Sequence, residues 1–197
     1  MINRFYEIQK GEILLDGINI KDINLHSLRK NIGIILQDPF IFAKTIKDNI
    51  ELNEMLSDEA IMETIHLSSA DDFIQSLPNG IDEIAHERGS SFSAGQKQLI
   101  AFARIFAHDP SIFILDEATA NIDTKTEELI QHSIDIISRE KTSIFIAHRL
   151  STIVNVDKII VLNNGEIIEQ GSHTELLKNT NGYYSKLYNA YYTNLVV

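Results

Sequence analysis

The chain has 197 residues, of which 44% are apolar, enough for one globular domain, or for a domain with a subdomain. Its 17 Lys and Arg are scattered among 28 Asp and Glu, and the formal net charge of -11 argues against a nucleic-acid-binding surface. The absence of cysteine excludes a disulfide framework, a cysteine-based zinc site and thiol catalysis. Because no apolar run approaches the roughly 18 residues of a membrane span, we expect a soluble intracellular chain that contacts membranes through a partner.

The first half of the chain predicts two short strands followed by a helical block. The expected elements are a strand at 12–16, a turn at 17–19, a buried strand at 32–36, and helices over 58–107 with breaks at 77–80 and 87–91. Residues 1–8 have no helix-start signal, so we expect them to continue an element that begins upstream.

In the second half, strands and helices alternate, which predicts parallel βα units. The expected elements are strands at 111–115 and 143–147, a helix at 125–139, strands at 158–162 and 166–170, and a helix at 183–192. Asn163-Asn164-Gly165 predicts a hairpin between the last two strands. The tyrosine-rich last helix could pack on the core or form a dimer contact, and we favour packing.

An apolar strand that ends in two carboxylates is the first candidate site. Residues 112–115 are followed by Asp116 and Glu117, at the strand end where open α/β sheets bind ligands. In a phosphate site, Asp116 would hold Mg²⁺ and Glu117 would polarise the attacking water. The alternative is a strand that simply leaves into a polar turn.

A possible phosphate receptor follows the second break in the helical block. Ser93-Ala94-Gly95-Gln96 precedes a helix expected to reach about Phe106, and the spacing of Ser93 and Gln96 fits a capping box. Capping leaves Gly95 unexplained, since glycine is a poor helix former but lets a ligand approach the backbone. A helix N-terminus with a serine hydroxyl favours phosphate.

Two more polar residues follow expected strands. His148 would emerge at the same sheet edge as Asp116, where it could bind a phosphate oxygen or orient a water. Gln37 could reach Mg²⁺ or the attacking water. Each has a structural alternative. His148 could be a structural histidine, and Gln37 could be a turn residue before Asp38-Pro39.

Together these residues resemble the nucleotide-binding domain of an ATP-binding cassette (ABC) transporter of the exporter type. The matching motifs are Gln37 as the Q-loop, 92–96 as the signature, 112–117 as the Walker B strand, 120–123 as the D-loop, and His148 as the switch histidine. The resemblance covers essentially the whole chain. It implies an α/β fold of the P-loop NTPase type, a parallel sheet with a helical subdomain, divided into 1–50, 51–107 and 108–197.

The chain departs from the family pattern at two points. Ala94 stands where the signature usually has its first glycine, so we expect weaker binding of the γ-phosphate there. The phosphate-cradling motif G-x-x-x-x-G-K-[ST] is absent, because no two of the nine glycines lie five residues apart. We therefore expect a partial domain that begins inside the helix after that loop, lacks the N-terminal strands, and leaves the strand ending at Ala147 with an exposed edge.

The resemblance also implies cofactors, site residues and partners. Two such domains would sandwich ATP and Mg²⁺. The implied residues are Glu117, His148 and Gln37 for catalysis, Ser93, Ala94, Gly95, Gln96 and Asp123 for nucleotide binding, and Asp116 and Gln37 for the metal. Coupling helices of a transmembrane partner would contact Glu87, Arg88, Gly89 and the Gln37 loop, at the cytoplasmic, inner face of the membrane.

Three functions remain open at this point. The first is the C-terminal part of an exporter ATPase, expected to be inactive alone without the phosphate-cradling loop. The second is a non-catalytic module that supplies the half-site of signature and D-loop to an intact partner. A soluble cassette ATPase of DNA repair or translation is disfavoured by the exporter-type loop at Glu87, the acidic charge and the lack of a coiled-coil insertion.

Overall fold

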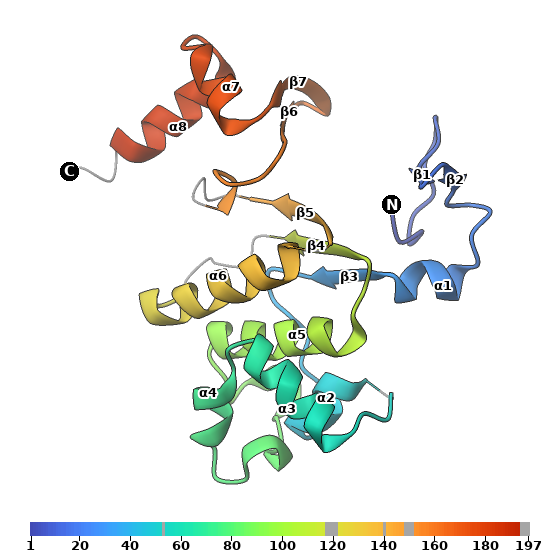
Figure 1. The fold of residues 1–197 in the computed structure, drawn as a ribbon, viewed down its shortest axis with the longest axis vertical. Coiled ribbons are helices and arrows are strands. Elements are labelled where there is room, and N and C mark those ends of the chain that lie inside the picture. Colours follow the sequence, from blue (N-terminus) through green and yellow to red (C-terminus); the bar gives the residue numbers. More distant parts are fainter. Residues whose placement is uncertain (53, 117–121, 140, 148–151, 194–197) are drawn as a thin grey trace. The chain divides into compact units, whose positions relative to one another are not determined.

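The computed structural model describes residues 1–52, 54–116, 122–139, 141–147 and 152–193. They form two compact units, Met1–Ile146 and Ala147–Val197 (Figure 1). The first unit holds a parallel sheet, a short hairpin and most of the helices, and the second holds a β-hairpin and two helices.

The sheet of the first unit has three parallel strands in the order β3 (Ile32–Ile35), β4 (Ile112–Asp116) and β5 (Thr142–Ile146). Ile35, Leu115 and Phe145 lie side by side in its register. Residues 113–115 of the central strand are buried, as expected for a continuous apolar run with neighbours on both faces. The predicted parallel βα arrangement is therefore confirmed. Among the described strands β5 pairs with β4 alone, which leaves the predicted unpaired edge.

A small hairpin precedes the sheet, and its turn differs from the prediction. Strands β1 (Leu14–Leu15) and β2 (Ile18–Asn19) are joined by Asp16 and Gly17, whose φ angles are 48° and 80°. Two positive φ angles make the tight turn that matches strand twist, and Asp-Gly favours it. The predicted turn at 17–19 is wrong, because Ile18 and Asn19 belong to the second strand.

Residues 1–8 contain no helix, so the expected continuation of a helix is also wrong. Arg4 has a φ of 52° and donates from Nη1 to the carbonyl oxygens of Ile20, Lys21 and Ile23, at 3.2–3.3 Å. These bonds hold the start of the chain against the segment between β2 and α1 (Leu25–Lys30).

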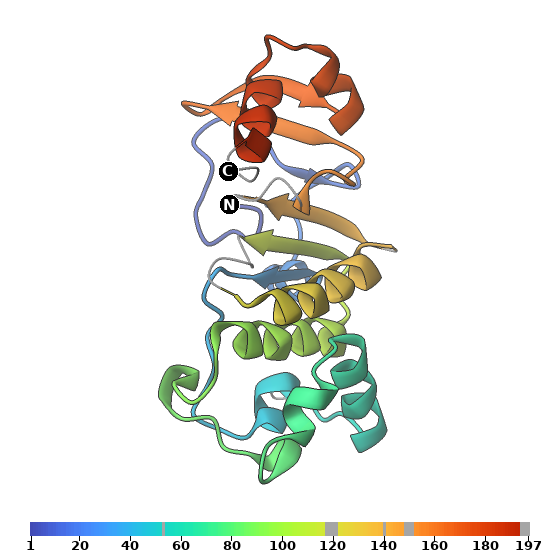
Figure 2. The same cartoon turned by 90° about the vertical axis from the view of Figure 1, so that its left-hand side faces the viewer.

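The helical block lies below the sheet in the view of Figure 1. Its elements are α2 (Ile46–Glu51), α3 (Asp58–Leu67), α4 (Asp71–Gln75), the short 3₁₀ turns η1 (Gly80–Asp82) and η2 (Glu87–Gly89), and α5 (Ala94–His108). Figures 1 and 2 both place α5 between the sheet and α2, α3 and α4. The sequence predicted the later helices but not α2, a six-residue helix that begins with a capping box at Thr45.

The main core lies where α5 meets the sheet and its neighbours. Phe102 of α5 is fully buried, and its ring centroid lies 6.0 Å from that of Phe113 in β4. Helix α6 (Thr124–Ser138), which connects β4 to β5, adds Ile130, Ile134 and Ile137 to the same cluster. Burial of these side chains is the main favourable term in the stability of this unit.

The second unit is a hairpin with two helices. Strands β6 (Ile159–Asn163) and β7 (Glu166–Gly171) turn at Asn164 and Gly165, which confirms the predicted hairpin. They are followed by α7 (His173–Lys178) and α8 (Tyr183–Thr193). Tyr184 is 1% exposed, and its hydroxyl lies 2.7 Å from His173 Nδ1, which supports packing for the tyrosine-rich helix. Within the described ranges, no helix combines the length and apolar character needed to cross a membrane.

Replacing Phe102 with alanine should destabilise the first unit by about 3–5 kcal/mol, because a large cavity would open under the sheet. Tyr6→Ala is the control, since Tyr6 is 77% exposed and should cost little. The measurement is the denaturant midpoint of both variants. Equal midpoints would show that α5 does not carry the core.

Candidate functional site

The carboxyl edge of the sheet gathers several of the predicted site residues. Asp116 is the last residue of β4, half-buried and paired in register with Ile146. Gln37 is exposed and follows β3 by two residues, at the same edge, since Ile35 lies beside Leu115. Glu117 and His148 lie outside the described residues.

Helices α5 and α6 both begin at this edge. Because α5 ends at His108 and β4 begins at Ile112, the C-terminal end of α5 lies at the amino edge of the sheet and its N-terminus at the carboxyl edge. The two N-termini touch. A Cβ atom added to Gly95 would clash with Thr126 Cγ2 and lie 3.2 Å from Ile122 Cγ2.

The start of α5 has the predicted capping box. Ser93 Oγ accepts a hydrogen bond from the Gln96 amide at 3.2 Å, and Gln96 Oε1 accepts one from the Ser93 amide at 2.9 Å. The amides of Ala94 and Gly95 belong to the first turn and have no acceptor within the helix. With the hydroxyl proton of exposed Ser93, they form a set of donors that fits an anion such as a phosphate.

The structure gives a different reason for Gly95 than access of a ligand to the backbone. Gly95 is buried, and its missing side chain is the space that Thr126 and Ile122 fill. Ala94, in contrast, is exposed at the helix start, so its methyl group faces outward from this contact. The glycine is therefore required for close approach of the two helices.

Asp123 is exposed and caps α6. One of its carboxylate oxygens accepts a hydrogen bond from the Thr126 amide at 3.0 Å. This backbone hydrogen bond lowers the pKa of Asp123, which keeps the carboxylate charged. Asp123 thus has a structural role in the same contact that requires Gly95.

No group of three or more His, Asp or Glu in the described part of the chain is arranged to hold a metal ion. Mg²⁺ is commonly held by one or two carboxylates with phosphate and water oxygens, so Asp116 and the amide oxygen of Gln37 are donors of the right kind.

The loop after Gln37 and the loop before the signature form one surface. The Ala85 amide donates to the Lys44 carbonyl at 2.8 Å, and the Ile46 amide donates to the Glu83 carbonyl at 3.0 Å. Gly89, with a φ of 64°, packs against Ile41 so closely that a Cβ would lie 3.0 Å from Ile41 Cβ. The sequence indicated both loops but not that they join.

This surface, which we call the apolar loop surface, consists of Phe40, Phe42 and Ile84. Their exposed fractions are 55%, 43% and 60%. The two phenylalanine rings meet edge to face, with centroids 4.9 Å apart. Exposed apolar groups that cluster in this way are typical of contact surfaces.

Sequence reasoning missed two basic residues of α5, Lys97 and Arg104, that bind the segment after Gln37. Lys97 Nζ lies 3.7 Å from a carboxylate oxygen of Asp38. Arg104 donates from Nε to the Asn49 carbonyl at 2.8 Å, and burial lowers the pKa of Arg104 to about 10, so it remains charged at neutral pH. A lone arginine inside the apolar run 99–107 was the available signal.

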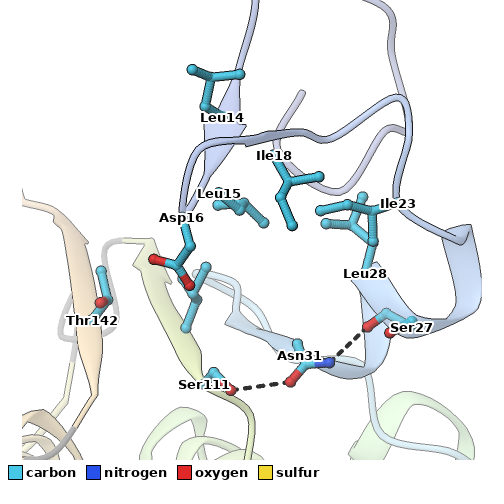
Figure 3. A pocket seen from close by; sticks show the side chains of 11 residues that line it. Leu14, Leu15, Asp16, Ile18, Ile23, Ser27, Leu28, Asn31, Ser111 and Thr142 are labelled. Carbon is cyan, nitrogen blue, oxygen red and sulfur yellow. Dashed lines mark hydrogen bonds between the residues drawn. The ribbon is translucent and has the colours of Figure 1, made fainter.

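The pocket of Figure 3 lies at the opposite, amino edge of the sheet. It has a volume of about 460 Å³ between the β1–β2 hairpin, α1 and the starts of β4 and β5, with Leu15, Leu28, Asn31 and Thr142 among its lining. Ser111 Oγ donates to Asn31 Oδ1 at 3.0 Å along its floor. Because open α/β sheets bind ligands at their carboxyl ends, this pocket is distinct from the candidate site.

Replacing Gly95 with alanine should destabilise the chain by about 1–3 kcal/mol, because the added methyl overpacks the contact between α5 and α6. Thr126→Ser removes the clashing Cγ2, so the double variant should recover part of the loss. Thermal unfolding of the two single variants and the double variant tests the coupling. Additive effects would contradict a direct contact.

Comparison with known proteins places this geometry in a family. The family model described as ABC transporter matches residues 1–120. The chain is 52% identical over 188 residues to the Streptococcus pneumoniae protein exp8, named as an ABC transporter ATP-binding protein, covering 95% of this chain and 32% of exp8. It is 46% identical over 185 residues to the Bacillus subtilis protein YheH, named as a multidrug resistance ABC transporter ATP-binding/permease protein, covering 93% of this chain and 28% of YheH.

A solved structure shows the same fold. The structure of a bacterial Atm1-family ABC exporter with ATP bound matches with a TM-score of 0.89 and 39% identity, over 96% of this chain and 33% of that chain. The chain thus spans about a third of the length of the relatives that it matches. The predicted P-loop NTPase fold of the α/β class is confirmed, and the chain belongs to the ABC transporter family.

Proposed function

We propose that this chain is the ATP-binding and ATP-hydrolysing part of an ABC exporter, which couples hydrolysis to transport across a membrane. The observation that carries the proposal is the meeting of Asp116, Gln37 and the N-termini of α5 and α6 at the carboxyl edge of one parallel sheet. The printed names of exp8 and YheH, which are an ATP-binding protein and an ATP-binding/permease protein, support it.

The residues of this chain would divide the work between two nucleotides. Toward the nucleotide on its own sheet edge, Asp116 and Gln37 would hold Mg²⁺, while Glu117 would accept a proton from the attacking water and His148 would orient it. Toward the nucleotide of a second cassette domain, the Ser93 hydroxyl and the first amides of α5 would donate hydrogen bonds to phosphate oxygens. The bound ATP supplies the phosphoanhydride bond that is hydrolysed.

The link to transport would run through the apolar loop surface. We infer that Phe40, Phe42 and Ile84, together with Glu87 and Arg88 of η2, contact the cytoplasmic ends of a transmembrane partner at the inner face of the membrane. The hydrogen bonds between the two loops support this assignment, because they make a single surface from the Gln37 loop and the 83–89 loop.

The 197 residues by themselves should hydrolyse ATP at no more than background rate, since they contain no G-x-x-x-x-G-K-[ST] loop to bind the phosphates. Release of phosphate from the purified chain, with and without an intact cassette domain, measures this. Hydrolysis by the chain alone at rates typical of cassette ATPases would overturn the assignment of roles.

Ser93→Ala should abolish the stimulation of an intact cassette partner, because the partner's nucleotide loses a hydroxyl donor. Ser172→Ala is a matched control. Ser172 forms the equivalent capping box at the start of α7, so both variants lose about 1 kcal/mol of capping but only one alters the proposed site. Equal partner ATPase activity in the two variants would contradict the role of Ser93.

A second candidate is a non-catalytic module that only lends α5 to a partner's nucleotide. The exposed, capped N-terminus of α5 favours it, because the hydrogen-bond donors of the signature are all among the described residues. Glu117→Gln separates the two functions. The total ATPase activity of the assembled transporter would fall if Glu117 is a catalytic base and would stay unchanged if the chain only lends its signature.

A further inference from the structure

The segment between Gln37 and α2 is held by side chains rather than by a regular element. Asn49, which is fully buried, accepts from the Phe42 amide at 2.8 Å and donates to the carbonyl oxygens of Phe42 and Thr45 at 3.0 and 2.9 Å. These three bonds fold residues 42–45 around one amide side chain.

Arg104, which belongs to α5, also binds this segment and so links it to the helix. Its guanidinium donates from Nε to the Asn49 carbonyl at 2.8 Å, from Nη2 to Asn49 Oδ1 at 3.3 Å, and from Nη1 to the Phe40 carbonyl at 3.2 Å. One planar group thus reaches both sides of the loop that carries the two exposed phenylalanines. A lysine ammonium on a flexible stem lacks this fork of fixed donors.

We propose that Arg104 is a positioning residue that fixes the shape of the apolar loop surface and makes it move with α5. This deepens the proposed function and rests on it only where the surface is taken to contact a transmembrane partner. The hydrogen bonds of Arg104 go to protein groups, so we assign it a positioning role and not a catalytic one. It acts on Phe40 and Phe42 through the backbone and through Asn49.

The helix geometry supports coupling between the two ends of α5. Lys97 and Arg104 are seven residues apart, which is about two turns, so they lie on one face of the helix. Lys97 pairs with Asp38 and Arg104 binds Phe40 and Asn49, so this face holds the loop at two points. The same helix is capped by Ser93, and a displacement of the loop surface would therefore be shared with the N-terminus that, in the proposed function, faces a partner's nucleotide.

Removing the guanidinium should loosen the loop without unfolding α5. The Phe40 and Asn49 carbonyl oxygens would lose their side-chain donor and turn to water, since buried polar groups rarely stay unpaired. Helix α5 would keep its apolar contacts with the sheet, where Phe102 packs on Phe113 and Ile105 lies against Gly33.

The chain has no tryptophan, so Phe42→Trp places a single fluorescent reporter on the loop. In this background, Arg104→Lys and Arg104→Gln should raise acrylamide quenching of the reporter by about twofold and shift its emission to the red, as local opening exposes it. Circular dichroism verifies that each variant is folded. If Arg104→Gln does not fold, the quenching measurement is made on Arg104→Lys alone. Unchanged quenching and emission in the lysine variant would overturn the proposal.

Arg4→Lys is the matched control, because the guanidinium of Arg4, like that of Arg104, makes three hydrogen bonds, here to the carbonyl oxygens of Ile20, Lys21 and Ile23. It should lower stability without changing the reporter. An equal change of quenching and emission in both lysine variants would show that Arg104 contributes only to overall stability, and it would overturn the positioning role.

Activity in the assembled transporter separates this proposal from the proposed function. Arg104→Lys should remove the stimulation of ATPase activity by the transmembrane partner and leave the basal activity unchanged. If the reporter responds while partner stimulation persists, the positioning role stands and the assignment of the apolar loop surface to the membrane partner is wrong.

Discussion

Burial of α5 between the parallel sheet and the helices α2 and α3 is the constraint on which the rest of the first unit depends. Phe102 fixes the helix against β4, while Ile105 lies over Gly33 of β3, so the helix cannot slide along the sheet without opening the core. Because it leads into β4, the same packing brings its N-terminus to the carboxyl edge, beside the start of α6. The direction of α5 therefore determines that Ser93–Gln96 lie at the carboxyl edge of the sheet.

Close contact at that edge gives single residues two roles. Gly95 is needed because Thr126 occupies the space of a side chain, and Asp123 caps the helix that carries Thr126. Ser93 closes a capping box and still keeps a hydroxyl proton for a ligand. The capping box and the proposed phosphate binding are therefore compatible at the start of α5.

The face of α5 that carries Lys97 and Arg104 contacts the chain between Asp38 and Asn49. Arg104 and Lys97 are cations on a largely buried helix, and such groups are tolerated in apolar surroundings when they are hydrogen-bonded or paired. Their partners are Asp38 and Phe40, in the irregular segment before α2, and Asn49 within α2. If the proposed function holds, these bonds would carry a contact on the apolar loop surface to the start of α5.

The sequence by itself determined the strands of the parallel sheet, the α5 and α6 helices, the Asn164-Gly165 hairpin and the family resemblance, because apolar periodicity, turn residues and motifs are local signals. It placed the first turn at 17–19, whereas the structure turns at Asp16-Gly17. It also predicted a helical continuation in residues 1–8, where bonds from Arg4 to distant carbonyls decide the conformation. Only the tertiary structure showed that Gly95 faces Thr126, that two loops join into one surface, and that Arg104 holds it. Each of these depends on atoms far apart in the chain, and no local pattern encodes their approach.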